Sequence, residues 1–264
     1  MGSASREAIA TARQSLAAVS AKDALAAGTQ LLSAARVIGE SAQLRSALAD
    51  PSAAAKDKQS IVDALFGALG KPARTLLGTI AGSRWSSQGE LLAGVEEIGI
   101  RALAASAGKD VSIESELFAF GQAVSSDAEL ELAVGSKLGA PDAKAELVNR
   151  LLSGKASAQT LAIVEHLVRE PRGRRIGQLL SQSAEIVADQ SGRTIATITT
   201  AASLPEAQLK RLAAGLESSY GRALHVNQVI DPQIVGGVRV QIGDDVIDGT
   251  IASRINDLRL QLAG

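Results

Sequence analysis

Three Gly-Lys pairs are the places where this sequence could hold a phosphate-binding loop: Gly70-Lys71, Gly108-Lys109 and Gly154-Lys155. Such a loop needs an earlier glycine at a fixed spacing and a Ser or Thr hydroxyl for Mg²⁺ directly after the lysine. At the three pairs these two positions hold Leu65 and Pro72, Leu103 and Asp110, and Asn149 and Ala156. We therefore expect no nucleotide or other cofactor to bind here.

Four aspartates near two glycines could suggest a divalent cation site: Asp231, Asp244, Asp245 and Asp248. A calcium loop would alternate oxygen ligands and close with a distant glutamate, and that pattern is absent. Aspartates next to Gly and Pro are typical of turns and helix caps. We expect turn and cap roles, and no metal site.

The densest basic run, which could bind phosphate or RNA, consists of Arg169, Arg172, Arg174 and Arg175. Glu165 and Glu170 lie beside it, and no aromatic residues are interleaved for base stacking. A solvated helix end or an acidic protein partner is the favoured interpretation, and nucleic acid is not an expected partner.

The remaining reactive or anchoring side chains are few. Trp85, the one tryptophan, could anchor a partner or cover the end of a helical bundle, and the second role is favoured. His166 and His225 are the two histidines, and neither shows the Ser, Cys or Asp pattern of a catalytic triad. No residue is predicted to be catalytic, so the chain is not expected to be an enzyme by itself.

Composition favours a helical, protein-binding chain. Of 264 residues, 46% are hydrophobic and only 2% aromatic, and Ala and Leu, which are strong helix formers, supply much of the apolar share. The net charge is -1, so no global field attracts nucleic acid or anionic lipid. The sequence has no apolar run long enough to span a membrane. Arg6 and Glu7 argue against a signal peptide, and the lack of cysteine fits a reducing cytoplasm.

Apolar residues at helical spacing, separated by Pro, Gly and Ser breaks, predict helices over most of the chain. Ile61, Val62, Leu65 and Leu69 show this spacing in one segment. The predicted helices are 3–20, 23–38, 41–49, 54–69, 72–84, 88–107, 113–126, 127–136, 142–153, 157–169 and 172–190.

An internal repeat relates the earlier helices to the later ones. Leu44 matches Leu130, Lys58 matches Lys144 and Val62 matches Val148 at one constant offset. The pairs Thr75-Leu76 with Thr160-Leu161, Arg84 with Arg169, and Gly108-Lys109 with Gly192-Arg193 follow after small loop deletions. Similarity at a fixed offset indicates a duplicated helical segment.

After Gly192 the apolar period changes from helical to alternating. Strands are predicted at 194–200, 224–230 and 238–242, with a hairpin turn at Gly243-Asp244-Asp245. Ser203 and Glu206 have the spacing of a capping box for a helix ending near 219. Asp248 is predicted to cap a last helix whose apolar stripe is Ile251, Ile255, Leu258 and Leu262. The result is a β-α-β-β-α unit.

The segment from Leu224 to Leu262 resembles the C-terminal signature of the F-type ATP synthase delta subunit (oligomycin-sensitivity-conferring protein) family. The signature positions are Asp231, Gly236, Gly237, Gly243, Asp248 and Gly249; Thr250 stands where Ser is commoner. The residues Leu48-Ala49-Asp50-Pro51 and Lys58 also look like a segment of the family's N-terminal bundle. The chain is longer than a typical member, and one extra copy of the repeat accounts for the excess.

The resemblance implies a non-catalytic subunit of the peripheral stalk that joins the catalytic head to the stalk and resists rotor torque. Its implied partners are the N-terminal helices of the alpha subunits and the C-terminal helix of the b subunit. It would be present in single copy in the complex, at the cytoplasmic face of the cell membrane, without inserting into the membrane.

By analogy, the alpha-binding groove lies between the first and fifth helices. Its residues would be Ile9, Arg13 and Leu16 on one side and Leu76, Leu77 and Ile80 on the other. Leu161, Val164 and Val168 offer an equivalent surface in the second copy. The duplicated segment could lengthen the stalk connection, add a second alpha contact or fill space.

The expected fold is mainly α: two N-terminal helical bundles from an internal repeat, then a small C-terminal α/β unit. The domains would be a six-helix bundle at 1–110, a second bundle at 111–191 and a stalk-binding domain at 192–264. The alternative function is a helical protein-binding adaptor unrelated to ATP synthase; an enzyme that uses the α/β tail is disfavoured because no acid, base or nucleophile candidates converge.

Overall fold

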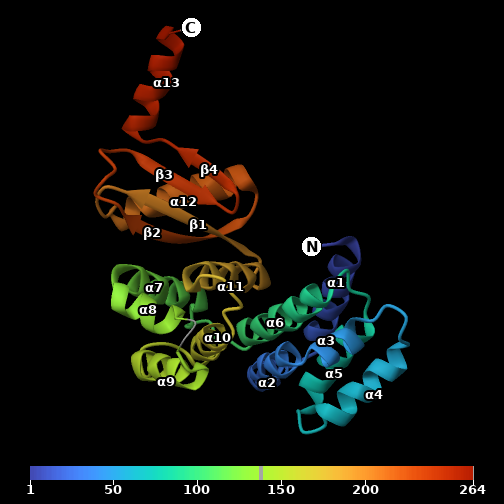
Figure 1. Cartoon of the computed structure of the whole chain (residues 1–264). Helices are drawn as coiled ribbons and strands as arrows, with labels where there is room; N and C mark the ends of the chain where they lie inside the picture. The colour runs from blue at the N-terminus through green and yellow to red at the C-terminus, as the bar shows by residue number, and fades with distance from the viewer. Residues whose placement is uncertain (137–138, 264) are drawn as a thin grey trace. The chain divides into compact units, whose positions relative to one another are not determined.

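The computed structural model describes residues 1–136 and 139–263, without the side chains of 257, 258 and 261–263 (Figure 1). Leu258 and Leu262 of the predicted apolar stripe therefore lie outside the described side chains. Two compact units make up the chain, Met1–Val187 and Ala188–Gly264. Among the described helices, none has the length and apolar character that a membrane span requires.

The first unit is built from helices, and the predicted mainly-α architecture is confirmed. The helices are α1 (Ser3–Ala17), α2 (Ala21–Glu40), α3 (Ala42–Ala49), α4 (Ala55–Leu65), α5 (Lys71–Gly82), α6 (Gln88–Ala105), α7 (Ile113–Ser126), α8 (Ala128–Gly135), α9 (Pro141–Leu152), α10 (Ala158–Arg169) and α11 (Ile176–Gln190), whose last residues belong to the second unit. We call α1–α6 the first bundle and α7–α11 the second bundle.

Polar residues set many of the helix starts. Side chains at the N-cap accept a backbone hydrogen bond from the first turn, which satisfies a donor that the helix itself leaves open. The capping residues are Ser20, Ser41, Ser87, Ser112, Asp127 and Ser157. The cap at Ser20 explains why α1 ends earlier than predicted. Ser20 is the N-cap of α2, so it cannot be the last residue of α1.

Two other helices are shorter than predicted. The helix predicted over 54–69 ends at Leu65, and Phe66 to Leu69 form a turn instead. The helix predicted from 172 begins at Ile176, because Arg172 and Gly173 have positive φ angles of 46° and 77° that no α-helix accommodates.

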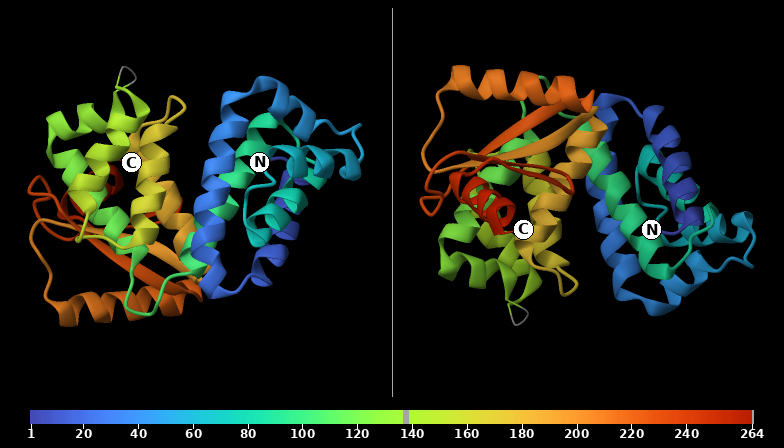
Figure 2. Two further views of the ribbon diagram at one scale, coloured as in Figure 1. Left: turned by 90° about the horizontal axis from the view of Figure 1, so that it is seen from below. Right: turned by 90° about the horizontal axis from the view of Figure 1, so that it is seen from above.

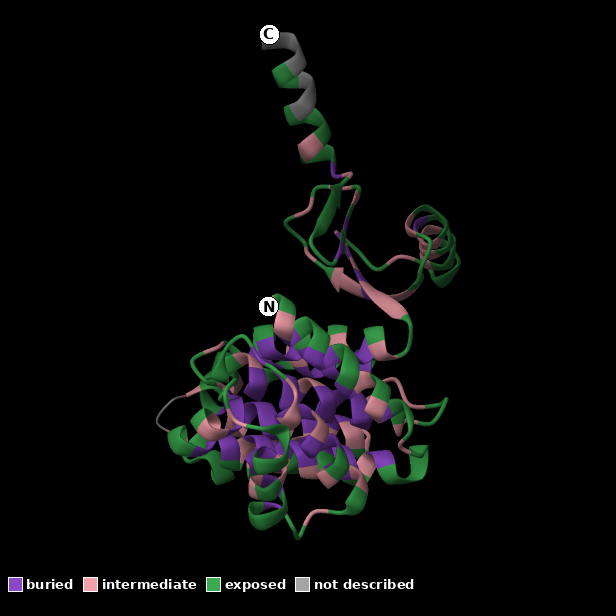
Figure 3. Cartoon of the chain, turned by 90° about the vertical axis from the view of Figure 1, so that its right-hand side faces the viewer, coloured by how far each residue is buried: buried purple, intermediate pink, exposed green. Residues whose placement is uncertain are grey.

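Close packing of α2 against α6 forms the centre of the first bundle (Figures 1 and 2). A Cβ placed at Gly28 would lie 2.7 Å from the carbonyl oxygen of Gly99, so the two helices approach more closely than larger residues permit. The buried residues gather in the interior of the unit (Figure 3). Trp85 is one of them: its Nε1 donates to Ile80 O at 2.7 Å, so it covers the core as favoured above.

The second unit is a four-stranded mixed sheet with two helices. Its elements are β1 (Arg193–Thr200), α12 (Glu206–Tyr220), β2 (Ala223–Ile230), β3 (Val238–Ile242), β4 (Asp245–Asp248) and α13 (Ile251–Ala263), and the strand order is β2-β1-β3-β4. β1 and β2 are parallel, while β3 is antiparallel to both β1 and β4. The predicted α/β unit is confirmed, and β4 is a short strand beyond the hairpin at Gly243.

Two predicted caps are wrong. Ser203 does not cap α12, whose N-cap is Pro205 without a side-chain hydrogen bond; the Ser203 hydroxyl instead lies 3.5 Å from Gln228 Oε1. Asp248 does not cap α13 directly. Its Oδ1 accepts from the backbone and hydroxyl of Thr250, and the Thr250 hydroxyl accepts from Ser253 N at 3.2 Å.

Candidate protein-interaction surfaces

The positions considered for phosphate or metal binding have structural roles. Gly70 is the N-cap of α5, and its N–H donates to Gln30 Oε1 at 2.9 Å. Asp231 Oδ1 accepts from Gln233 N at 2.9 Å, as a turn aspartate does. Within the described part of the chain, no group of three or more His, Cys, Asp or Glu residues could hold a metal ion.

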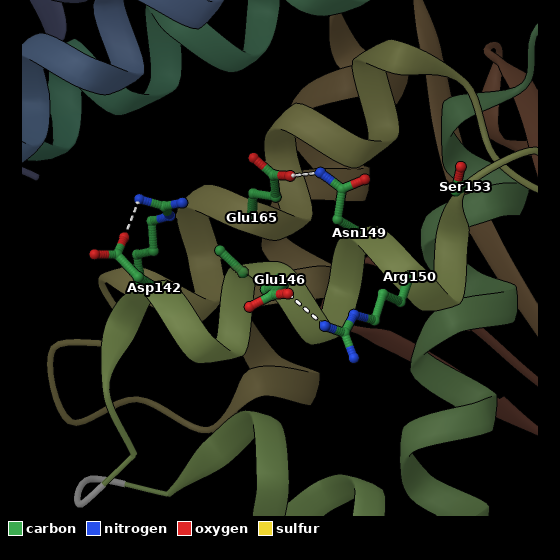
Figure 4. Close-up of a pocket in the computed structure, with 8 residues that line it drawn as sticks. Asp142, Glu146, Asn149, Arg150, Ser153 and Glu165 are labelled. Atoms are coloured by element: carbon green, nitrogen blue, oxygen red, sulfur yellow. Dashed lines mark hydrogen bonds and ion pairs between the residues drawn. The ribbon is translucent and has the colours of Figure 1, made fainter.

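A groove between α9 and α10 has a volume of about 470 Å³ (Figure 4). Its lining consists of Ala145 and of the charged and polar residues Asp142, Glu146, Asn149, Arg150, Ser153, Glu165 and Arg169. The figure marks interactions between some of these side chains, among them the ion pair of Arg150 with Glu146. Arg169 pairs with Asp142 at 2.7 Å, and Asn149 donates to Glu165 at 2.8 Å. The charged side chains Arg169 and Asp142, and Arg150 and Glu146, thus pair with each other within the groove.

The residues predicted to line a groove between the first and fifth helices do meet, but in the core. α1 packs against α5, and Ile9, Leu16, Leu76, Leu77 and Ile80 belong to one buried cluster. Arg13 is half-buried. These five apolar side chains therefore pack α1 against α5 within the chain itself. That they bind a partner stays a prediction.

The equivalent surface in the second bundle is also largely filled. Val164 and Val168 of α10 are fully buried, and Leu161 is half-buried. A partner helix would have to use the polar margins of either site, such as the edge where the hydroxyls of Ser15 and Thr79 lie 3.5 Å apart.

Most of the exposed large apolar side chains that the structure describes lie in the second unit, and no pattern in the sequence indicated their exposure. Large apolar side chains that are about half or more exposed there are Ile230, Val235, Val246, Ile247, Ile251, Ile255 and Leu260, with exposed fractions from 46% to 82%. The stripe on the last helix has helical spacing, and its residues Ile251 and Ile255 are each 46% exposed. Exposed apolar surface of this kind marks a protein-binding site.

The edge strand β4 belongs to this surface. All four of its residues are exposed, and it pairs with β3 on one side only. Val246 is paired with Gln241 and Ile247 with Val240, so the two apolar side chains project from opposite faces of the sheet. An unpaired edge with apolar side chains can accept another chain.

The signature residues join the hairpin to α13. Gly237 has φ +86°, and a Cβ there would lie 2.4 Å from Gly249 O. Gly249 N donates to Val238 O at 2.9 Å, and Ile251 N donates to Gly236 O at 3.0 Å. Hydrogen bonds from Thr250 hold the pKa of the Asp248 carboxyl below its usual value. These residues therefore fix where α13 begins.

Comparison with known proteins gives one family. A family model described as ATP synthase delta (OSCP) subunit matches residues 100–262. The ATP synthase subunit delta of Leifsonia xyli subsp. xyli is 56% identical over 100% of both chains, and that of Streptomyces avermitilis is 39% identical over 98% of both. A chain of the Toxoplasma gondii mitochondrial ATP synthase hexamer aligns with 62% of this chain and 95% of its own length, with 20% identity and a TM-score of 0.39.

Proposed function

The chain belongs to the ATP synthase delta (OSCP) subunit family, and from this membership we propose that it is a stator subunit of the proton-translocating F-type ATP synthase. In this role it belongs to the peripheral stalk, joins the catalytic head to the stalk and resists rotor torque during ATP synthesis. It has no active site of its own. Similarity to delta subunits over the full length of the chain argues against the alternative of an unrelated helical adaptor.

The exposed apolar surface of the second unit is the observation that best supports this role. Ile251 and Ile255 of α13 and the edge strand β4 offer an apolar helix face and an open strand edge. An amphipathic helix from a partner can bury such a face. We assign this surface to the C-terminal helix of the b subunit.

The first bundle is assigned to the alpha subunits. The margin between α1 and α5, with half-buried Arg13 and the Ser15–Thr79 edge, would receive an N-terminal helix of an alpha subunit. Each complex would hold one copy of the chain, at the cytoplasmic face of the cell membrane. Its partners there are proteins, with neither nucleic acid nor direct membrane insertion involved.

A pull-down from native membranes with the tagged full-length chain tests this function. The wild-type chain is expected to recover alpha, beta and b subunits. Arg13→Glu reverses a charge on the α1 margin. When the tagged chain is mixed with isolated catalytic head, this variant should recover less alpha subunit than the wild-type chain does. The matched control is Lys22→Glu, on the exposed surface of α2, which should not change it. Recovery of no ATP synthase subunit by the wild-type chain would refute the proposal.

A further inference from the structure

A buried charged cluster joins the two bundles. Glu96 of α6 is 8% exposed and His166 of α10 is 3% exposed, and His166 Nε2 lies 2.7 Å from Glu96 Oε1. Arg172, in the loop after α10, donates from both terminal nitrogens to the same carboxylate, at 2.6 and 3.2 Å. Glu96 of the first bundle thus binds His166 and Arg172 of the second, and Arg174 Nη2 lies 4.0 Å from its Oε2.

The backbone of Arg172 depends on this contact. Its φ of +46° lies in the left-handed region, which costs free energy for a residue with a side chain. The two-pronged bond to Glu96 offsets that cost, because a charge-assisted pair between guanidinium and carboxylate is strong and fixes geometry. The loop between α10 and α11 is therefore shaped by a residue of α6.

The rest of the interface between the first and second bundles is less apolar than a bundle core. A cavity of about 150 Å³ remains between α2 and α10, with Thr29, Ser33, Arg36, Glu165 and Arg169 in its lining. A second polar tie, from Gln159 Nε2 to Ser106 Oγ at 3.1 Å, lies at the start of α10. A buried ion pair adds little net stability, while the loss of one partner is costly because it leaves a charge buried alone.

The repeat explains why α10 needs a partner from the first bundle. Matched residues relate α3, α4 and α5 to α8, α9 and α10, and α1 lies before the repeat. α5 packs against α1, α2, α3, α4 and α6; α10 packs against α7 and α9 of its own copy and against α2 and α6. Helices α2 and α6 of the first bundle thus pack on α10, as α1 packs on α5.

We propose that the Glu96–His166–Arg172 cluster is a lock that holds the two helical bundles as one rigid block. The duplicated segment then extends the rigid body of the subunit, and does not hang from it as a tethered module. The second bundle has no helix that corresponds to α1, and α2 and α6 of the same chain cover α10 instead. This inference concerns the chain alone, so it stands or fails independently of the proposed partners.

Spin labels can measure the rigidity, because the chain has no cysteine. Ala64 on α4 and Ala143 on α9 are exposed, so Ala64→Cys and Ala143→Cys place one label on each bundle of the full-length chain. Pulsed electron paramagnetic resonance gives the distance distribution between the labels. We expect one narrow distribution in the otherwise wild-type chain.

Two variants release the lock. Arg172→Met removes the two-pronged bond from the loop, and Glu96→Gln with Arg172→Met removes both charges together, so that neither is left buried alone. Each should turn the narrow distribution into a broad one while Trp85 fluorescence stays that of a buried indole. If the double variant does not fold, the distribution of Arg172→Met decides.

Glu90→Gln is the matched control. Glu90 is on the same helix, α6, but its carboxylate binds Ser5 and Gly2 within the first bundle. This variant should keep the narrow distribution. A broad distribution in the wild-type chain, or an unchanged one in both lock variants, would overturn the proposal.

Discussion

Lys58 of α4 and Lys144 of α9 are buried at matched positions of the repeat, each directed to the end of the preceding helix. Their exposed fractions are 3% and 6%. Lys144 Nζ donates to the carbonyl of Ser136, the C-cap of α8, and Lys58 interacts with the charge of Asp50, the C-cap of α3. A cation is favourable at a helix C-terminus. In both bundles a buried lysine thus interacts with the C-cap residue of the preceding helix.

Lys58→Met should stabilise the protein at neutral pH. Burial lowers the pKa of Lys58 from its usual 10.5, and Asp50 opposes part of that shift. A base with a depressed pKa costs stability while it is protonated, and this cost disappears as pH rises through the lowered pKa toward 10.5. We expect a gain of up to about 1 kcal/mol at pH 7, shrinking at high pH.

Urea unfolding at pH 7 and at a pH close to the usual lysine pKa of 10.5 measures this effect. Lys56→Met, on the exposed surface of the same helix, is the control and should change little. A loss of stability at pH 7 in Lys58→Met would show that the helix-end interaction outweighs desolvation.

Ser5→Ala should weaken the attachment of α1 to α6 in a pH-dependent way. The Ser5 hydroxyl donates to Glu90 Oε2 at 2.5 Å and is the main cause of the lowered pKa of Glu90. For an acid with a lowered pKa, the added stability is present above the usual value of 4.5 and is lost as pH falls through the lowered pKa.

The destabilisation caused by Ser5→Ala should therefore be larger at pH 7 than in acid. Chemical unfolding at both pH values measures the difference, with Ser3→Ala, at an exposed position of α1, as the control. The interpretation fails if Ser5→Ala costs as much in acid as at pH 7.

Gly237→Ala should disrupt the joint between the hairpin and α13. The new Cβ would lie 2.4 Å from Gly249 O and 2.8 Å from Thr250 Cα, both backbone atoms, at a φ of +86°. We expect a loss of more than about 2 kcal/mol from the second unit. Gly243→Ala, also at positive φ but with no atom within 4 Å, should cost only about 1 kcal/mol. Denaturation followed by circular dichroism compares the two, and equal costs would contradict the role given to Gly237.

Ile251→Ser with Ile255→Ser should weaken stalk binding without unfolding the chain. Both side chains are 46% exposed, so their loss should change stability by less than about 1 kcal/mol. Binding to a peptide that spans the C-terminal helix of the b subunit should weaken about tenfold or more, because buried apolar anchors dominate such contacts. Titration calorimetry measures the affinity. Leu65→Ser, at a 59% exposed position of the first bundle, is the control; unchanged affinity in the double variant would place the stalk site elsewhere.

Local patterns were sufficient to predict the helices and the strands β1, β2 and β3, because helical and alternating apolar periods are properties of short segments; no range was predicted for β4. They were misleading for Ser203. Ser203 and Glu206 have the spacing of a capping box, but α12 begins at Glu206 and its N-cap is Pro205. The Glu96–His166–Arg172 cluster could not be predicted, since its members lie 70 and 76 residues apart in sequence and meet only through the packing of α6 and α10. The exposed stripe on α13 has helical spacing, but its spacing alone cannot tell a core face from a partner-binding face.

The measurement that tests the central claim most directly is proton pumping in membrane vesicles depleted of this protein. A stator component without an active site should leave ATP hydrolysis by the detached head intact. ATP-driven proton pumping should be lost on depletion and restored by adding back the wild-type chain. Hydrolysis that depends on the chain, or pumping that continues without it, would contradict the account.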